Sequence, residues 1–90
     1  MQIEMKDYFI AGLKRVKPII EGHFKKRDIY HTLDVAEILD TLEKGNALKL
    51  QTEVLYDVWE AISHSSLRYL EVTKVRDTIY SLWEYKMFTE

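Results

Sequence analysis

The chain of 90 residues has no cysteine, one proline and three glycines. The absence of cysteine excludes a disulfide framework, an iron–sulfur site and a cysteine-ligated zinc site. The few glycines and the lack of Asn-Gly or Asp-Gly pairs disfavour a fold built from β-hairpins. Apolar runs are only a few residues long, whereas a membrane-spanning helix needs about 20. The N-terminal residues show no signal-peptide pattern, so we expect a cytoplasmic protein with no membrane partner.

The composition is that of a folded protein. Hydrophobic residues make up 47% of the chain and aromatic residues 12%, and the formal net charge is only −2. Such a chain is too apolar and too nearly neutral to be intrinsically disordered. The length predicts one domain over residues 1–90, with a small core in which every large side chain counts.

Helical periodicity is the strongest pattern in the sequence. Segments at about 3–26, 33–44, 53–63 and 67–87 carry apolar residues at spacings of three and four, which is one face of a helix. The predicted fold is therefore all-α, a compact bundle of four or five short amphipathic helices. The last segment could be one helix or two, with Thr73 as a second start. The four stripes are Phe9, Leu13, Val16, Ile20 and Phe24; Val35, Ile38, Leu39 and Leu42; Val54, Leu55, Val58 and Ile62; and Val72, Val75, Ile79 and Leu82.

Boundary signals divide these segments. Pro18 interrupts the first stripe, and two outcomes are open: a helix that ends near Val16 and restarts at the proline, or one kinked helix. We expect the break. Thr32 and Thr52 are the expected N-caps of the second and third segments, and Gly45 is the expected stop of the second.

Basic residues are concentrated between residues 14 and 27. Six of them stand there against one acid, Glu21, although the whole chain is slightly acidic. Such a cluster could contact nucleic-acid phosphates or dock onto an acidic protein surface. The sequence pI of about 5.9 disfavours nucleic acid. The predicted basic patch is Lys14, Arg15, Lys17, Lys25, Lys26 and Arg27.

Asp57, Glu60 and His64 share one helical face and are the best candidates for a metal or acid–base site. That face lies well away from the apolar stripe of the same segment, so we expect it to point to water. Exposed acids on a surface helix do not make a metal site, and none is predicted. His23 and His31 are expected to be surface or helix-end histidines.

Aromatic residues gather in the C-terminal half of the chain. Tyr80, Trp83 and Phe88 widen the last stripe beyond what a surface helix needs, and such residues are typical anchors of protein interfaces. We assign these three as a candidate partner-binding site. A wide buried stripe within the monomer is the alternative. The aromatic residues concerned are Tyr56, Trp59, Tyr69, Tyr80, Trp83, Tyr85 and Phe88.

No motif for catalysis or phosphate binding is present, since the serines lack a Gly-rich nucleophile turn and no Gly-rich loop exists. No catalytic residue, metal or cofactor is assigned. The sequence therefore predicts a small non-enzymatic helical protein that acts by protein–protein interaction, as a regulator, inhibitor or adaptor, or by forming a homodimer. The alternative is a nucleic-acid-binding protein that uses the basic stretch 14–27.

Overall fold

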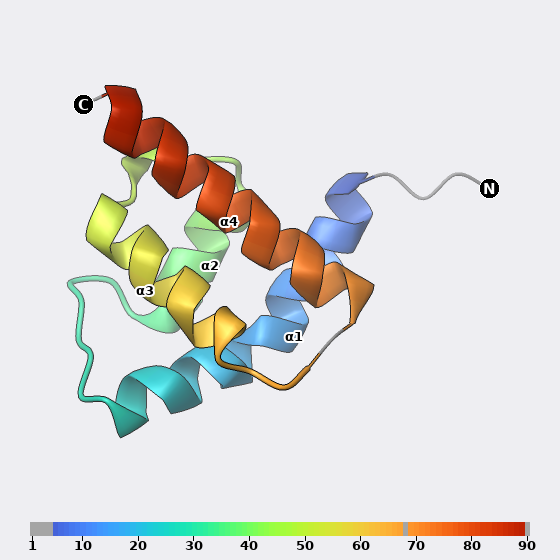
Figure 1. The fold of residues 1–90 in the computed structure, drawn as a ribbon, viewed down its shortest axis with the longest axis vertical. Helices are drawn as coiled ribbons and strands as arrows, with labels where there is room; N and C mark the ends of the chain where they lie inside the picture. The colour runs from blue at the N-terminus through green and yellow to red at the C-terminus, as the bar shows by residue number, and fades with distance from the viewer. Residues whose placement is uncertain (1–4, 68, 90) are drawn as a thin grey trace.

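The computed structural model describes residues 5–67 and 69–89, and over these residues the chain is all-helical. The elements are α1 (Met5–Lys26), α2 (Val35–Glu43), the 3₁₀ turn η1 (Ala47–Lys49), α3 (Thr52–Ser63) and α4 (Leu70–Thr89). Helix α4 crosses the molecule and packs on both α1 and α3, while α2 lies behind it (Figure 1). The predicted all-α bundle is confirmed. None of the described helices is long and apolar enough to cross a membrane.

The predicted apolar stripes form the core. All of their members are buried except three at its margin, which are partly buried: Phe9, Val35 and Leu82. Ala47 and Leu50 from the α2–α3 connection also lie in this core. All four helices therefore share a single hydrophobic cluster, as the periodicity predicts.

Helix α1 runs unbroken through Pro18, so the predicted break is wrong. A proline inside a helix removes one backbone hydrogen bond and costs about 3 kcal/mol. Val16 and Ile20, on either side of Pro18, are fully buried in the same core. Burying a large aliphatic side chain contributes about 1.5–3 kcal/mol, so the two flanking contacts outweigh the defect.

Gly12 allows α1 and α4 to approach closely. A Cβ atom at this position would collide with the backbone carbonyl of Glu71 and with the side chain of Val75. No other residue fits without moving the α4 backbone. Gly22 on the same helix has nothing near its missing side chain.

The ends of α2 are capped partly as predicted. Its N-cap is Asp34 rather than Thr32, because the Asp34 carboxylate accepts a hydrogen bond of 2.8 Å from the Glu37 backbone N–H. This is the usual three-residue reach of a capping side chain. Gly45 follows the C-terminus with a φ of +77°, and the predicted stop is confirmed.

Helix α3 begins one residue earlier than predicted. Thr52 is its first residue, and Gln51 stands at the N-cap with no side-chain hydrogen bond to the helix. Helix α4 is one continuous helix, so Thr73 does not start a second. The short turn η1 occupies the connection between α2 and α3.

Candidate functional site

Four aromatic rings meet on the surface where α3 and α4 lie side by side. Tyr56 and Trp59 come from α3, and Tyr80 and Trp83 come from α4. Neighbouring ring centroids are 5.6–6.0 Å apart and the rings are tilted by 40–51°, so each ring contacts two others in a closed cycle. These separations and tilts are favourable for aromatic pairs. We call these four residues the aromatic strip.

The strip follows from helix geometry. Each helix contributes two rings three residues apart, which places both on one face. Because α3 and α4 run antiparallel, Tyr56 meets Trp83 and Trp59 meets Tyr80. Tyr56 is 43% exposed and Tyr80 is 41% exposed, while the two tryptophans are partly buried. The rings thus form a contiguous, solvent-facing surface instead of the interior of the core.

The structure brings together two of the three aromatic residues assigned from the sequence. Tyr80 and Trp83 are in contact, 5.7 Å between centroids. Phe88 is 83% exposed and, five residues after Trp83, lies about 140° around the helix from it. Tyr56 and Trp59 complete the strip, and the assignment missed them. Their i, i+3 spacing beside an already filled apolar stripe is the signal that could have found them.

A hollow of about 420 Å³ adjoins the strip at one end. Trp59 and Tyr80 form one side of it, and Ser63, Arg76 and Asp77 form the rest together with Ser81. Arg76 donates to the Asp77 carboxylate from Nε at 3.2 Å. The end of the strip is therefore polar and carries both signs of charge.

The six basic residues predicted as one patch do not share one surface. Arg15 Nε lies 2.5 Å from Glu71 Oε1 of α4, and its guanidinium carbon is 4.4 Å from the centre of the Tyr69 ring. Arg27 Nη1 lies 3.9 Å from Glu60 Oε1 of α3. Both arginines thus have partners within the chain.

The remaining lysines are divided between two sides of α1. Lys26, eleven residues after Arg15, lies on the side of that arginine. Lys14 and Lys17 line a hollow of about 220 Å³ against α2. Lys17 and Lys25 border a second hollow of about 430 Å³ beside the 27–34 connection.

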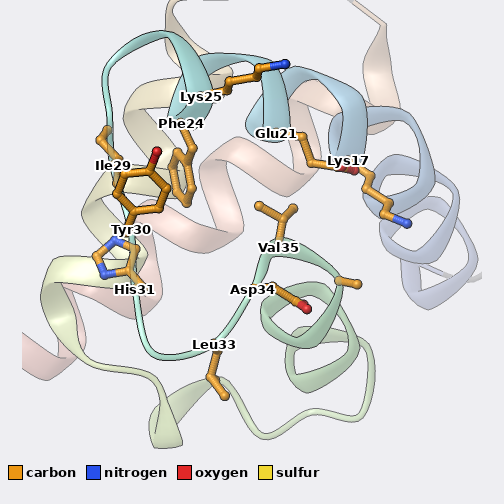
Figure 2. A pocket seen from close by; sticks show the side chains of 11 residues that line it. Lys17, Glu21, Phe24, Lys25, Ile29, Tyr30, His31, Leu33, Asp34 and Val35 are labelled. Carbon is orange, nitrogen blue, oxygen red and sulfur yellow. The ribbon is translucent and has the colours of Figure 1, made fainter.

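Figure 2 shows this larger hollow. Phe24, Ile29 and Val35 give it an apolar wall, and the amino groups of Lys17 and Lys25 point outward from its edge. Its lining also includes two acids, Glu21 and Asp34. The hollow is therefore mixed in charge.

The acids of α3 that were expected to face water are covered. The side chains of Asp57 and Glu60 are only 19% and 28% exposed, because the end of α1 and the connection after it run across this side of α3. His31 Nε2 donates to Asp57 Oδ2 at 2.8 Å. Arg27 and His64 both face Glu60 Oε1, at 3.9 and 3.6 Å. The sequence could not show this because the covering residues lie about 30 positions away.

The three histidines belong to this same region. The His23 and His64 rings stack 5.7 Å apart, and the His31 ring meets the edge of Phe24. The His31 side chain is only 9% exposed, so the expectation of a surface histidine is wrong there. Burial lowers the pKa of His23, and the positive charge of Arg27 and of protonated His64 lowers it further. We call His23, Arg27, His31, Asp57, Glu60 and His64 the polar junction.

The polar junction holds the groups that acid–base chemistry uses, but they face one another. The Asp57 carboxylate orients His31, as in many catalytic pairs. Among the described residues, no group of three or more ligating side chains could hold a metal ion. The arrangement ties the end of α1 and the α1–α2 connection to α3.

Fold and surface together define a small helical bundle with a satisfied polar junction and an exposed aromatic strip. Comparison with protein-family models, with curated proteins and with solved structures finds no match. The function has to be inferred from the geometry of the chain itself.

Proposed function

We propose that this protein acts by binding another protein through the aromatic strip and that it catalyses no reaction. The observation that carries the proposal is the closed cycle of four rings at the surface, in which both tyrosines are more than 40% exposed. Single exposed apolar residues are common on protein surfaces, but contiguous apolar patches mark interaction sites.

The residue types support this proposal. Tyrosine and tryptophan are enriched among the residues that dominate binding energy at interfaces. Each ring of the strip is already held by its two neighbours, so the strip itself loses little side-chain entropy when a partner docks. The hydroxyl groups of Tyr56 and Tyr80 add hydrogen-bonding capacity to the apolar ring faces.

The test compares affinity capture from cell extract by the wild-type chain and by the double variant Tyr56→Ser/Tyr80→Ser. We expect a partner that the wild type retains and the double variant loses, since interface anchors typically contribute about 2 kcal/mol or more each. Circular dichroism must show that the variant is folded. Tyr30→Ser is the matched control, because Tyr30 is 82% exposed and lies outside the strip.

Two results would contradict the proposal. One is capture of the same partner by the double variant. The other is loss of the partner with Tyr30→Ser to the same extent, which would place the binding surface elsewhere. Sedimentation of the purified chain at rising concentration distinguishes self-association from binding of a different protein. If the strip forms a homodimer, the measured mass rises with concentration. If the partner is a different protein, the mass stays that of the monomer.

A nucleic-acid-binding function is the second candidate, and one observation favours it. Lys14, Lys17 and Lys25 lie along the α2 side of α1, where they border two adjoining hollows. Fluorescence anisotropy with labelled duplex at low salt tests it, with Lys17→Gln/Lys25→Gln as the variant. Binding that weakens steeply with salt and is lost in the variant would support this candidate, and no binding at low salt would remove it.

A further inference from the structure

The aromatic strip is the middle of a longer stripe on each of its two helices. The stripe on α3 adds Thr52 and Ser63, and the stripe on α4 adds Arg76 and Met87, in each case four residues beyond the rings. Both stripes therefore advance by four, three and four residues, the spacing by which one face of a helix packs lengthwise against other helices. The buried core stripes of α3 and α4 use other residues, so this is a second face on each helix.

The two helices bring these stripes into matching layers. At one end, Lys86 Nζ donates to the backbone carbonyl of Leu50, just before α3, and this contact sets Met87 level with Thr52. At the other end, both stripes border the same hollow. With the two ring pairs between them, four layers follow the length of α3, whose 12 residues span about 17 Å at 1.5 Å per residue.

This surface has the geometry of half a four-helix bundle. Two antiparallel helices with layers at alternating spacings of three and four residues are what a second such pair packs against in a bundle. Met87 is 50% exposed, Tyr56 43% and Tyr80 41%, so the side chains of a second helix pair can reach three of the four layers. Within the described residues, α1 and α2 pack on the core stripes instead.

The charges along this surface balance. Arg76 pairs with Asp77 at one end, and Glu84 and Lys86 stand on α4 towards the other. The whole chain carries a formal net charge of only −2. A strongly basic or strongly acidic partner therefore gains no net attraction here, whereas two copies of this chain meet without strong repulsion.

The arrangement of the rings is repeated within the strip. Each helix supplies a tyrosine followed three residues later by a tryptophan, and the helices run antiparallel. A half turn about the surface normal therefore exchanges Tyr56 with Tyr80 and Trp59 with Trp83. A second strip laid over this one in a two-fold arrangement sets ring pair on ring pair, which is the self-complementarity that a symmetric dimer needs.

We propose that the protein bound by the aromatic strip is a second copy of this chain, a proposal that rests on the proposed function above. The α3–α4 pairs of the two copies form a two-fold symmetric, antiparallel four-helix arrangement with the rings at its centre. Two helices of about 10 Å diameter and about 17 Å length give a contact at the small end of specific interfaces. We therefore expect a reversible dimer with a micromolar dissociation constant, whose monomer is folded.

Sedimentation equilibrium measures the association directly. The wild-type mass should rise from 10.8 kDa towards twice that value between about 5 and about 500 µM, the range that brackets a micromolar dissociation constant. The chain has two tryptophans, and both belong to the strip. The intrinsic tryptophan emission should therefore shift over the same concentrations as the mass.

Charges placed in the strip make the test specific. Tyr80→Lys sets like charges together in the dimer and should weaken association at least about tenfold, and Tyr80→Glu should do the same. An equimolar mixture of the two variants should recover association, because opposite charges then meet. Tyr85→Lys is the matched control and should leave association unchanged. Tyr85 is 57% exposed on α4 and, two residues after Trp83, lies on the far side of the helix from the strip.

Three results would overturn the inference, once circular dichroism shows that each variant is folded. The first is a monomer mass at every concentration. The second is equal weakening by Tyr80→Lys and Tyr85→Lys, and the third is a mixture that associates no better than either Tyr80 variant alone. If the chain stays monomeric and Tyr56→Ser/Tyr80→Ser loses a partner from extract, the strip binds a different protein and the proposed function holds. If that double variant keeps the partner, both proposals fail.

Discussion

The two flanks of α3 that border its buried face are opposites. On one flank, Asp57 and Glu60 are covered and paired with groups from the end of α1 and the connection after it. On the other, Tyr56 and Trp59 join rings of α4, where Tyr56 is exposed and Trp59 is partly buried. Carboxylates favour water and aromatic rings favour burial, so each flank holds the less suitable residue type for its exposure.

The two flanks differ in how far their side chains are satisfied by contacts within the chain. The polar flank is satisfied within the chain, and its hydrogen bonds offset the cost of partial burial. On the aromatic flank the rings contact one another, but Tyr56 and Tyr80 keep over 40% of their surface exposed, which leaves that surface available to a partner. The comparison supports a stabilising role for the polar junction and agrees with the proposed docking role of the aromatic strip.

The largest expected effect comes from disrupting the close contact between α1 and α4 at Gly12. Gly12→Ala would force α4 away from α1, and we expect the free energy of unfolding to fall by about 3 kcal/mol, as in strongly overpacked cores. Urea denaturation followed by circular dichroism measures it. Gly22→Ala on the same helix meets open space and should raise stability by about 0.5–1 kcal/mol. Equal effects at the two glycines would contradict the close contact.

The next prediction compares the loss of unfolding free energy at two adjacent residues, one on each flank of α3. Asp57→Ala removes the partner of His31 and should cost about 2 kcal/mol, in the range for hydrogen bonds to charged groups. Tyr56→Ser removes one half-exposed ring and should cost about 1 kcal/mol or less. Chemical denaturation of both variants under the same conditions provides the comparison. A larger loss for Tyr56→Ser would mean that the strip is mainly a structural element.

Local patterns in the sequence were sufficient to predict the fold class and most of the core, although Ala47, Leu50 and Ala61 lie in the core outside the predicted stripes. The apolar periodicity identified every helix, because helix faces repeat over distances that a sequence window captures. Pro18 was misjudged because its local cost is certain, whereas the compensating burial of Val16 and Ile20 depends on tertiary packing. The N-cap moved from Thr32 to Asp34 because both residues are good caps and only the path of the chain decides between them.

Surface sites were harder to predict because neighbours in sequence and neighbours in space differ. Residues 14–27 are clustered along the chain, but a helix turns successive residues by about 100° and distributes their charges around α1. In the aromatic strip the reverse holds, since residues distant in sequence are neighbours in space. Trp59 and Tyr80 are far apart in sequence, and the packing of α4 on α3 brings them together. Tyr80 and Trp83 could be grouped from the sequence because they lie three residues apart on one helix.

The smallest expected effect concerns the pH dependence of the polar junction. The pKa of His23 in the folded chain lies below its ordinary value of 6.5, first because of burial and then because of Arg27 and His64. The folded state therefore binds fewer protons than the unfolded state as the pH falls through 6.5. The contribution of His23 to stability is complete above that pH and is lost progressively towards the lowered pKa.

Urea midpoints of the wild type and His23→Gln between about pH 7.5 and about pH 5 isolate this contribution, because the other groups titrate in both proteins. Glu60 and Asp57 oppose the shift, so the difference should be small, with the wild type losing more stability on acidification than the variant. A steeper loss in His23→Gln would mean that the protonated ring stabilises the junction through these acids. The junction would then be strengthened by acid, and the contrast between a satisfied polar flank and an open aromatic flank would depend on pH.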